Sequence, residues 1–112
     1  MRGDRERLLD IVEAIERIEK HTNSDVVQVA EDELVQIWVL YHLQAIGEAV
    51  RSLSASLKNE YPEAPWSEII GMRNILVHHY FEIDADIVQS AVTNDLPILK
   101  TIVQTILSDI DR

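Results

Sequence analysis

The sequence predicts an all-α protein, an up-and-down bundle of four to five helices in a single domain that spans residues 1–112. Apolar residues recur at helical spacing over long stretches of the chain. Glycine and proline, which interrupt regular structure, occur only three times each. The hydrophobic content of 46% supplies one small core, and 112 residues fit one compact domain.

The first expected helix covers roughly residues 4–21. Its apolar residues from Leu8 to Ile18 recur on one face, as in a helix with one solvated side. Glu13 and Arg17 stand at i, i+4 in the order that favours an ion pair. Residues 22–25 break the pattern and supply capping side chains for the next helix.

A second helical region is expected over roughly residues 24–58. Gly47 lies inside it, and an interior glycine costs about 1 kcal/mol relative to alanine, so we expect close packing against another helix there. The region carries a long apolar stripe that we expect to face the core, and its members are Leu34, Ile37, Trp38, Tyr41, Ala45, Ala49 and Leu53.

Proline and aspartate mark the remaining helices. Pro65 suits the first turn of a third helix that runs to about His79, because a missing N–H costs nothing at that position. A fourth helix is expected over roughly residues 85–92. Asp95 then suits the N-cap of a fifth helix that ends near residue 109.

The chain contains no cysteine, which excludes disulfide bonds, thiolate zinc sites and cysteine nucleophiles. No apolar run approaches the ~18 residues that a membrane span requires. The charged N-terminus lacks the apolar core of a signal peptide. We therefore expect a cytoplasmic protein with no membrane partner.

The formal net charge of -10 constrains the possible partners. Proteins that bind nucleic acid along a broad surface carry a basic stripe, and this chain does not have the composition for one. Three alternatives follow: nucleic acid is not a partner, contact with it is local and catalytic, or another subunit supplies basic surface. A basic partner protein also fits, since acidic surfaces attract such partners.

The segment from Gly71 to Phe81 carries the residues best suited to chemistry. Arg73 falls in the middle of an apolar helix side, where a guanidinium is costly unless it is paired or opens onto a polar cavity. Asn74 and His78 share the other side of this helix at i, i+4. Arg73 and His78 lie about 140° apart on a straight helix. They converge only if the helix end unwinds or two copies of the chain meet, which indicates a dimeric site.

Structural roles are the alternative for each of these residues. Arg73 can serve as an ion-pair partner, His78 can interact with the last carbonyls of its helix, and Tyr80 can belong to the core. A metal site from His78, His79 and Glu82, with His21 and His42 as distant candidates, matches no standard zinc spacing. The sequence also lacks a Gly-rich phosphate loop, so we expect neither a metal nor a cofactor.

Arg73-x4-His78-x-Tyr80 matches the R-x4-6-H-x-Y motif of the HepT-like branch of the HEPN proteins, and the sequence resembles that family over roughly residues 4–110. Further blocks that resemble the family are Ile46 to Val50, Tyr61-Pro62 through Pro65-Trp66, Ile69 to Asn74, Tyr80-Phe81 with Asp84, and Asn94 to Pro97.

The resemblance implies a homodimeric, metal-independent endoribonuclease, the toxin of a toxin–antitoxin pair, acting on RNA such as tRNA or mRNA. An MntA-like nucleotidyltransferase antitoxin would silence it by adding AMP to Tyr80. Arg73 and His78 would be catalytic: the guanidinium suits phosphate oxygens, and imidazole suits proton transfer near neutral pH. Asn74 and Tyr80 would support them, and we assign His79 no role.

A binding module is the alternative function. The chain would then be a non-catalytic helical partner that presents substrate to a minimal nucleotidyltransferase. The acidic composition fits this alternative as well.

Overall fold

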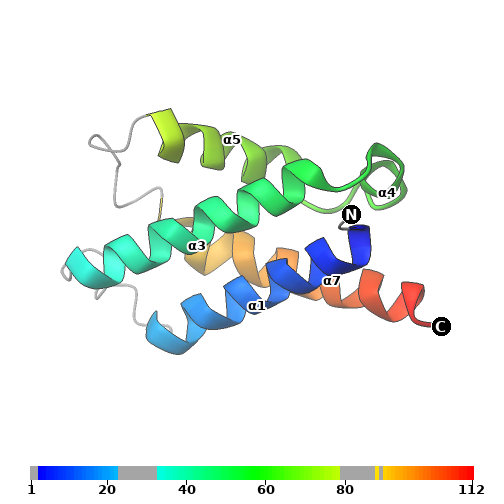
Figure 1. Ribbon diagram of the computed structural model, residues 1–112, viewed down its shortest axis with the longest axis horizontal. Helices are drawn as coiled ribbons and strands as arrows, with labels where there is room; N and C mark the ends of the chain where they lie inside the picture. Colours follow the sequence, from blue (N-terminus) through cyan, green and yellow to red (C-terminus); the bar gives the residue numbers. More distant parts are fainter. Residues whose placement is uncertain (1–2, 23–32, 79–87, 89) are drawn as a thin grey trace.

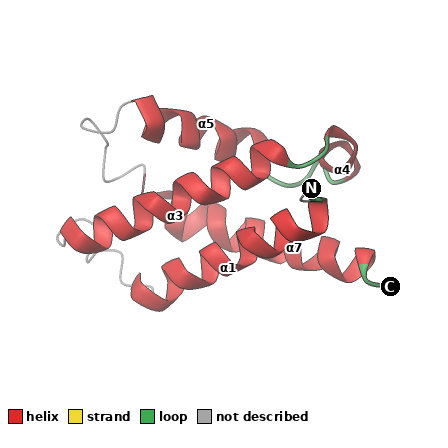
Figure 2. Ribbon diagram, viewed as in Figure 1, coloured by secondary structure: helices red, strands yellow, loops and turns green. Residues whose placement is uncertain are grey.

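The computed structural model describes residues 3–22, 33–78, 88 and 90–112. Four long helices follow one another along the chain: α1 (Asp4–Thr22), α3 (Glu33–Ser52), α5 (Trp66–His78) and α7 (Leu96–Ile110). A short helix α4 (Ala55–Glu60) precedes α5, and a π-helical turn η2 (Ala91–Asp95) leads into α7. The described ranges contain no strand (Figure 2), which confirms the all-α prediction.

The four long helices alternate in direction, as an up-and-down bundle requires. Figure 1 shows α1 and α5 running toward one end of the molecule, and α3 and α7 running back. Helix α3 packs against both α1 and α5, while α7 packs against α1. No described helix combines the length and apolar content that crossing a membrane would need.

The core is built from residues at helical spacing on the inner faces of these helices. Leu8, Ile11, Ile15 and Ile18 of α1 are fully buried, which confirms the face expected for the first helix except at Leu9, which is 42% exposed. The ion pair between Glu13 and Arg17 is present at 2.7 Å. The fully buried partners on the other helices are Val39, Leu43, Ile46, Val50, Ile69, Leu99, Val103 and Ile106.

Helix α3 is rotated relative to the prediction over its first half, so the expectation that its apolar stripe faces the core was wrong there; it holds at the other end, where Leu53 is buried and Ala49 packs against the core. Leu34, Ile37 and Tyr41 are 78%, 45% and 69% exposed, and Ala45 is exposed as well. The residues that α3 buries instead are Val39, Leu40, His42, Leu43, Ile46, Gly47 and Val50. This helix carries apolar residues around most of its circumference, so its sequence pattern alone does not select one face. The face that α3 buries is selected by its packing against α1 and α5.

The second helical region is interrupted before its predicted end, while residues 24–32 of its predicted start lie outside the described residues. Helix α3 ends at Ser52, and α4 begins after Ser54, whose hydroxyl accepts a hydrogen bond from the Leu57 N–H at 3.2 Å. The same hydroxyl donates to the Asp4 carboxylate of α1 at 2.6 Å. The cap and its link to α1 therefore replace the continuous helix expected up to residue 58.

The predicted N-cap at Asp95 was wrong as well. Asp95 has helical backbone angles and makes no capping hydrogen bond, and the helix runs through from η2 into α7. Pro97 explains the π turn: in a regular α-helix its ring would clash with the carbonyl four residues earlier. The wider turn, in which the Leu96 N–H bonds to the Ala91 carbonyl, lets the helix continue. Half of the fourth helix expected at 85–92, residues 85–87 and 89, lies outside the described residues, and the described residues 88 and 90–92 are helical.

The start of α5 agrees with the prediction. Pro65 stands directly before Trp66, and its carbonyl accepts the Ile69 N–H at 3.1 Å. The Trp66 ring is buried, and its indole N–H donates to the Tyr61 carbonyl at 2.9 Å. These contacts fix where α5 begins and hence the position of Arg73 two turns later.

Candidate functional site

The structure places the predicted site residues on and after α5. Arg73 and Asn74 lie in the second half of the helix, and His78 is its last residue. The His78 side chain, His79 and Tyr80 lie outside the described residues. The geometry of the site is therefore built on Arg73 and on what surrounds it.

The Arg73 side chain lies in the seam between α5 and α3, with 23% of its surface exposed. Its Nη2 is 3.0 Å from Glu48 Oε2 on α3, and its Nη1 donates to Asn74 Oδ1 at 3.2 Å. The guanidinium is thus paired, which is one of the two conditions for placing it on an apolar side of a helix. Enough surface remains open for it to meet an anion.

Glu48 is the site residue that sequence reasoning missed. It belongs to the Ile46–Val50 block that resembles the HepT-like family, but that resemblance assigns it no contact. A helical pattern predicts neighbours three or four positions away, whereas Glu48 and Arg73 lie on different helices. The one available signal was Arg73 itself, since a guanidinium on an apolar side of a helix needs a counter-charge or a polar cavity.

Gly47 provides the space that Arg73 occupies. A Cβ atom built on Gly47 would lie 2.6 Å from Arg73 Cγ and still closer to Arg73 Cβ. Both distances are well below the 3.4–4 Å of an ordinary van der Waals contact. The prediction that this interior glycine permits close helix packing is confirmed, and the partner is α5. The aliphatic part of the Arg73 side chain therefore packs directly against α3 at Gly47.

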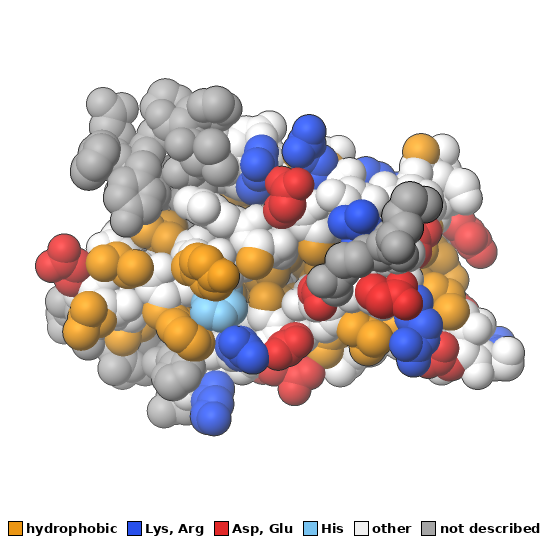
Figure 3. Space-filling view, viewed as in Figure 1, with side chains coloured by type: hydrophobic (Ala, Val, Ile, Leu, Met, Phe, Trp, Pro, Cys, Tyr) orange, Lys and Arg blue, Asp and Glu red, His pale blue; other side chains and the backbone are white. Residues whose placement is uncertain are grey.

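The charges around the seam form a small cluster of Arg51, Glu48 and Arg73. Glu48 Oε1 is 3.5 Å from Arg51 Nη1, while its other oxygen meets Arg73. Two positive groups share one carboxylate, so the cluster keeps a positive charge in a chain whose net charge is -10. Figure 3 shows basic side chains beside acidic ones along this upper edge of the molecule. Guanidinium groups match phosphate and carboxylate oxygens, so the cluster is suited to an anionic ligand.

An exposed apolar surface lies on the first half of α3, and we call Leu34, Ile37 and Tyr41 the α3 apolar face. Figure 3 shows hydrophobic side chains gathered there, on the same view of the molecule as the charged edge. Contiguous exposed apolar residues of this kind mark interaction surfaces. The α3 apolar face and Glu48 belong to one helix, so a partner on the face would lie near the site.

His42 is buried beneath Tyr41, with 4% of its surface exposed. Its Nδ1 lies 2.8 Å from the Trp38 carbonyl, and its ring contacts the rings of Trp38 and Tyr41. A carbonyl only accepts, so Nδ1 carries the hydrogen and is not available to a metal. Among the described residues, no three His, Asp or Glu side chains are grouped to hold a metal ion.

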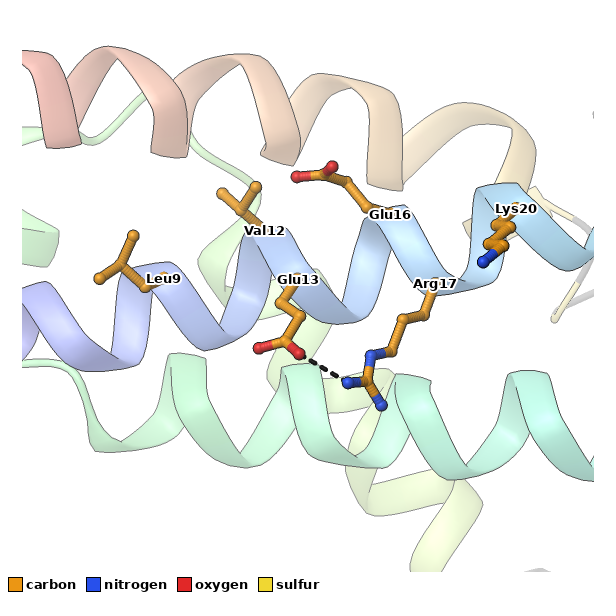
Figure 4. Close-up of a pocket in the computed structure, with 6 residues that line it drawn as sticks. All are labelled: Leu9, Val12, Glu13, Glu16, Arg17 and Lys20. Atoms are coloured by element: carbon orange, nitrogen blue, oxygen red, sulfur yellow. Dashed lines mark hydrogen bonds and ion pairs between the residues drawn. The ribbon is translucent and has the colours of Figure 1, made fainter.

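An open pocket of about 580 Å³ lies along α1, away from the Arg73 seam. Figure 4 shows the Glu13 and Arg17 side chains on the same side of α1, joined by their ion pair. Its lining residues are Leu9, Val12, Glu13, Glu16, Arg17 and Lys20. None of them belongs to the motif.

The family model and the relatives that match this chain all carry the name of a ribonuclease. The family model "Ribonuclease HepT-like" matches residues 11–106. A Thermococcus cleftensis protein named "Probable ribonuclease HepT" is 37% identical over 100 residues, covering 88% of this chain and 91% of the relative. A Methanocaldococcus jannaschii protein named "Putative RNase MJ1380" is 32% identical over 100 residues, covering 88% and 92%. No solved structure was found to match the chain.

Proposed function

The chain belongs to the HepT-like ribonuclease family, and we propose that it is a single-domain, metal-independent endoribonuclease. The observation that carries this proposal is the Arg73 guanidinium, which opens the Arg73-x4-His78-x-Tyr80 motif and is held in the α3–α5 seam with part of its surface open. An always-charged planar group in that setting is suited to the phosphate of a nucleic acid backbone.

The proposed reaction uses the nucleophile that RNA itself carries. The 2′-hydroxyl attacks the adjacent phosphorus, the O2′–P bond forms and the P–O5′ bond breaks, which leaves a 2′,3′-cyclic phosphate and a 5′-hydroxyl. His78 is proposed to take the proton from the 2′-hydroxyl and to return it to the departing O5′, since imidazole titrates near neutral pH. Arg73 is proposed to stabilise the negative charge that grows on the non-bridging oxygens. Asn74 and Tyr80 are proposed to support these two residues.

We propose that two copies of the chain build one site. Arg73 and His78 point about 140° apart on a regular helix, so one copy does not bring them together without unwinding. The α3 apolar face offers a surface for the second copy, because Ile37 and Tyr41 are 45% and 69% exposed. Pairing there would bring the cation of each copy to a shared groove. Two such groups would give local attraction for RNA despite the acidic net charge.

The biological role that we propose is that of a toxin controlled by an antitoxin. An MntA-like nucleotidyltransferase would add AMP to Tyr80, which introduces bulk and a negative charge near Arg73. The net charge of -10 suits a partner with basic surface. The substrate would be tRNA or mRNA, and both it and the partner would be cytoplasmic.

Cleavage by the purified chain tests the proposal. The wild-type protein should cut RNA in the presence of EDTA, and Arg73→Ala and His78→Ala should lose the activity while remaining folded. Arg17→Ala is the matched control, since Arg17 is also a paired arginine but lies on α1. A wild-type chain that is inert alone, yet binds a nucleotidyltransferase, would favour the non-catalytic binding module instead.

A further inference from the structure

Two contacts hold the Arg73 guanidinium, one at each terminal nitrogen. Nη2 meets Glu48 Oε2 across the seam at 3.0 Å, and Nη1 donates to Asn74 Oδ1 at 3.2 Å. A planar group held at both ends has a fixed plane as well as a fixed position. Arginine has five N–H donors, so the others remain for a ligand.

Glu48 pairs with Arg73 from outside α5, because its carboxylate reaches the guanidinium from α3. The Arg73 side chain is 23% exposed and therefore partly desolvated, which strengthens its attraction to a nearby carboxylate. The Glu48 carboxylate lies closer to Arg73, at 3.0 Å, than to Arg51, at 3.5 Å. The contact to Arg73 is thus the tighter of its two ion pairs.

Gly47 ties the same turn of α3 to the Arg73 stem. The missing side chain at Gly47 leaves room for Arg73 Cβ and Cγ, and the next residue presents the carboxylate to the guanidinium. Gly47 and Glu48 therefore together set the position of the Arg73 aliphatic chain and of its guanidinium. Such an arrangement fixes the head group before a ligand arrives, which is what transition-state stabilisation by a preset charge requires.

We propose that Glu48 is a positioning residue for RNA cleavage: it orients the Arg73 guanidinium so that its unused donors face the phosphate. This inference rests on the proposed ribonuclease function. Glu48 acts through Arg73 and touches no reacting atom. It stays paired with Arg73 while RNA is bound, because the free donors of the guanidinium suffice for a phosphate.

Glu48→Gln tests the proposal, since it keeps the shape and removes the charge. We expect kcat to fall roughly 10- to 100-fold, because misplacing a group by about 1 Å can cost 10²-fold. KM should stay the same or fall, since one negative charge near the RNA is lost. Glu48→Asp keeps the charge but withdraws it by one methylene, so its kcat should lie between those of wild type and Glu48→Gln.

Glu13→Gln is the matched control. Glu13 also pairs with an arginine and has a side chain of similar exposure, 61% against 51% for Glu48, but it lies on α1. Glu13→Gln removes the same charge as Glu48→Gln, but from an exposed ion pair that does not include Arg73. Its kcat should therefore stay within about twofold of the wild-type value. Thermal unfolding checks that all variants are folded at the assay temperature.

The NMR signal of the Arg73 side-chain Nε–H gives a readout that is independent of activity. Assigned through its loss in Arg73→Lys, it should shift and broaden in Glu48→Gln and stay unchanged in Glu13→Gln. A cleaving wild type with an unaltered kcat in Glu48→Gln would overturn the positioning role alone. A wild type that cleaves no RNA would refute the proposed function, whatever the NMR signal does.

Discussion

Gly47→Ala is the sharpest test of how the seam sets the site. The new Cβ would lie 2.6 Å from Arg73 Cγ, whereas ordinary contacts begin at 3.4 Å. Arg73 Cγ must therefore move outward by at least 0.8 Å, from 2.6 Å to 3.4 Å. The atoms that the new Cβ meets are Arg73 Cα, Cβ and Cγ, which cannot move far unless the α5 backbone moves with them. We therefore expect the guanidinium to move away from Glu48.

Two opposing terms set the stability of this variant. Alanine is favoured over glycine inside a helix by about 1 kcal/mol. Overpacking a tight helix contact costs about 1–3 kcal/mol. We expect the free energy of unfolding to fall by roughly 0–2 kcal/mol. Cleavage should fall by much more, roughly 10- to 100-fold, because the loss comes from a displaced guanidinium and not from unfolding.

Single-turnover cleavage of a labelled oligoribonucleotide, measured well below the melting temperature, separates these two effects. Gly71→Ala is the control, since a Cβ at Gly71 meets nothing within 4 Å. That control should gain about 1 kcal/mol of stability and cleave like wild type. Wild-type cleavage by a folded Gly47→Ala, or an equal loss in both variants, would refute the reasoning.

Two further predictions concern association and pH. Tyr41→Glu, on the α3 apolar face, should give a monomer by light scattering and lose RNA cleavage, whereas Ile98→Glu on α7, also an exposed apolar position, should change neither. Dimers that persist in Tyr41→Glu would contradict pairing through this face. Burial, with a smaller effect of Glu68, raises the pKa of Asp95 above its ordinary value, so the ionised carboxylate destabilises the folded state above that pKa. Asp95→Asn should therefore raise Tm at pH 7, and the gain should shrink as the pH falls toward about 4; an equal gain at both pH values would contradict the assignment.

The helices whose patterns are simple were predictable from the sequence. Helix α1 has one apolar face and one charged face, so its bounds and most of its buried residues followed from spacing, with Leu9, 42% exposed, as the exception. Helix α5 was located by Pro65 and by the motif. Helix α3 was different, because an apolar residue stands on nearly every side of it.

Local chemistry also gave two wrong boundaries. Asp95 has the side chain of an N-cap, yet the π turn lets the helix continue past Pro97. Ser54 caps α4 in part because Asp4, on another helix, holds its hydroxyl and its N–H. In both cases the outcome depends on backbone geometry or on a distant partner that a short window of sequence does not contain.

The sequence by itself determined that helices form, where the motif falls, and that Arg73 needs a counter-charge or a polar cavity, because helical hydrogen bonds and side-chain spacing act over three or four residues. The tertiary structure alone decided which side of α3 is buried and that Glu48 and Gly47 receive Arg73. Those facts depend on how two helices, distant in the chain, rotate about their axes to fill a common core. That rotation is settled by packing between surfaces and is not encoded in the period of either helix.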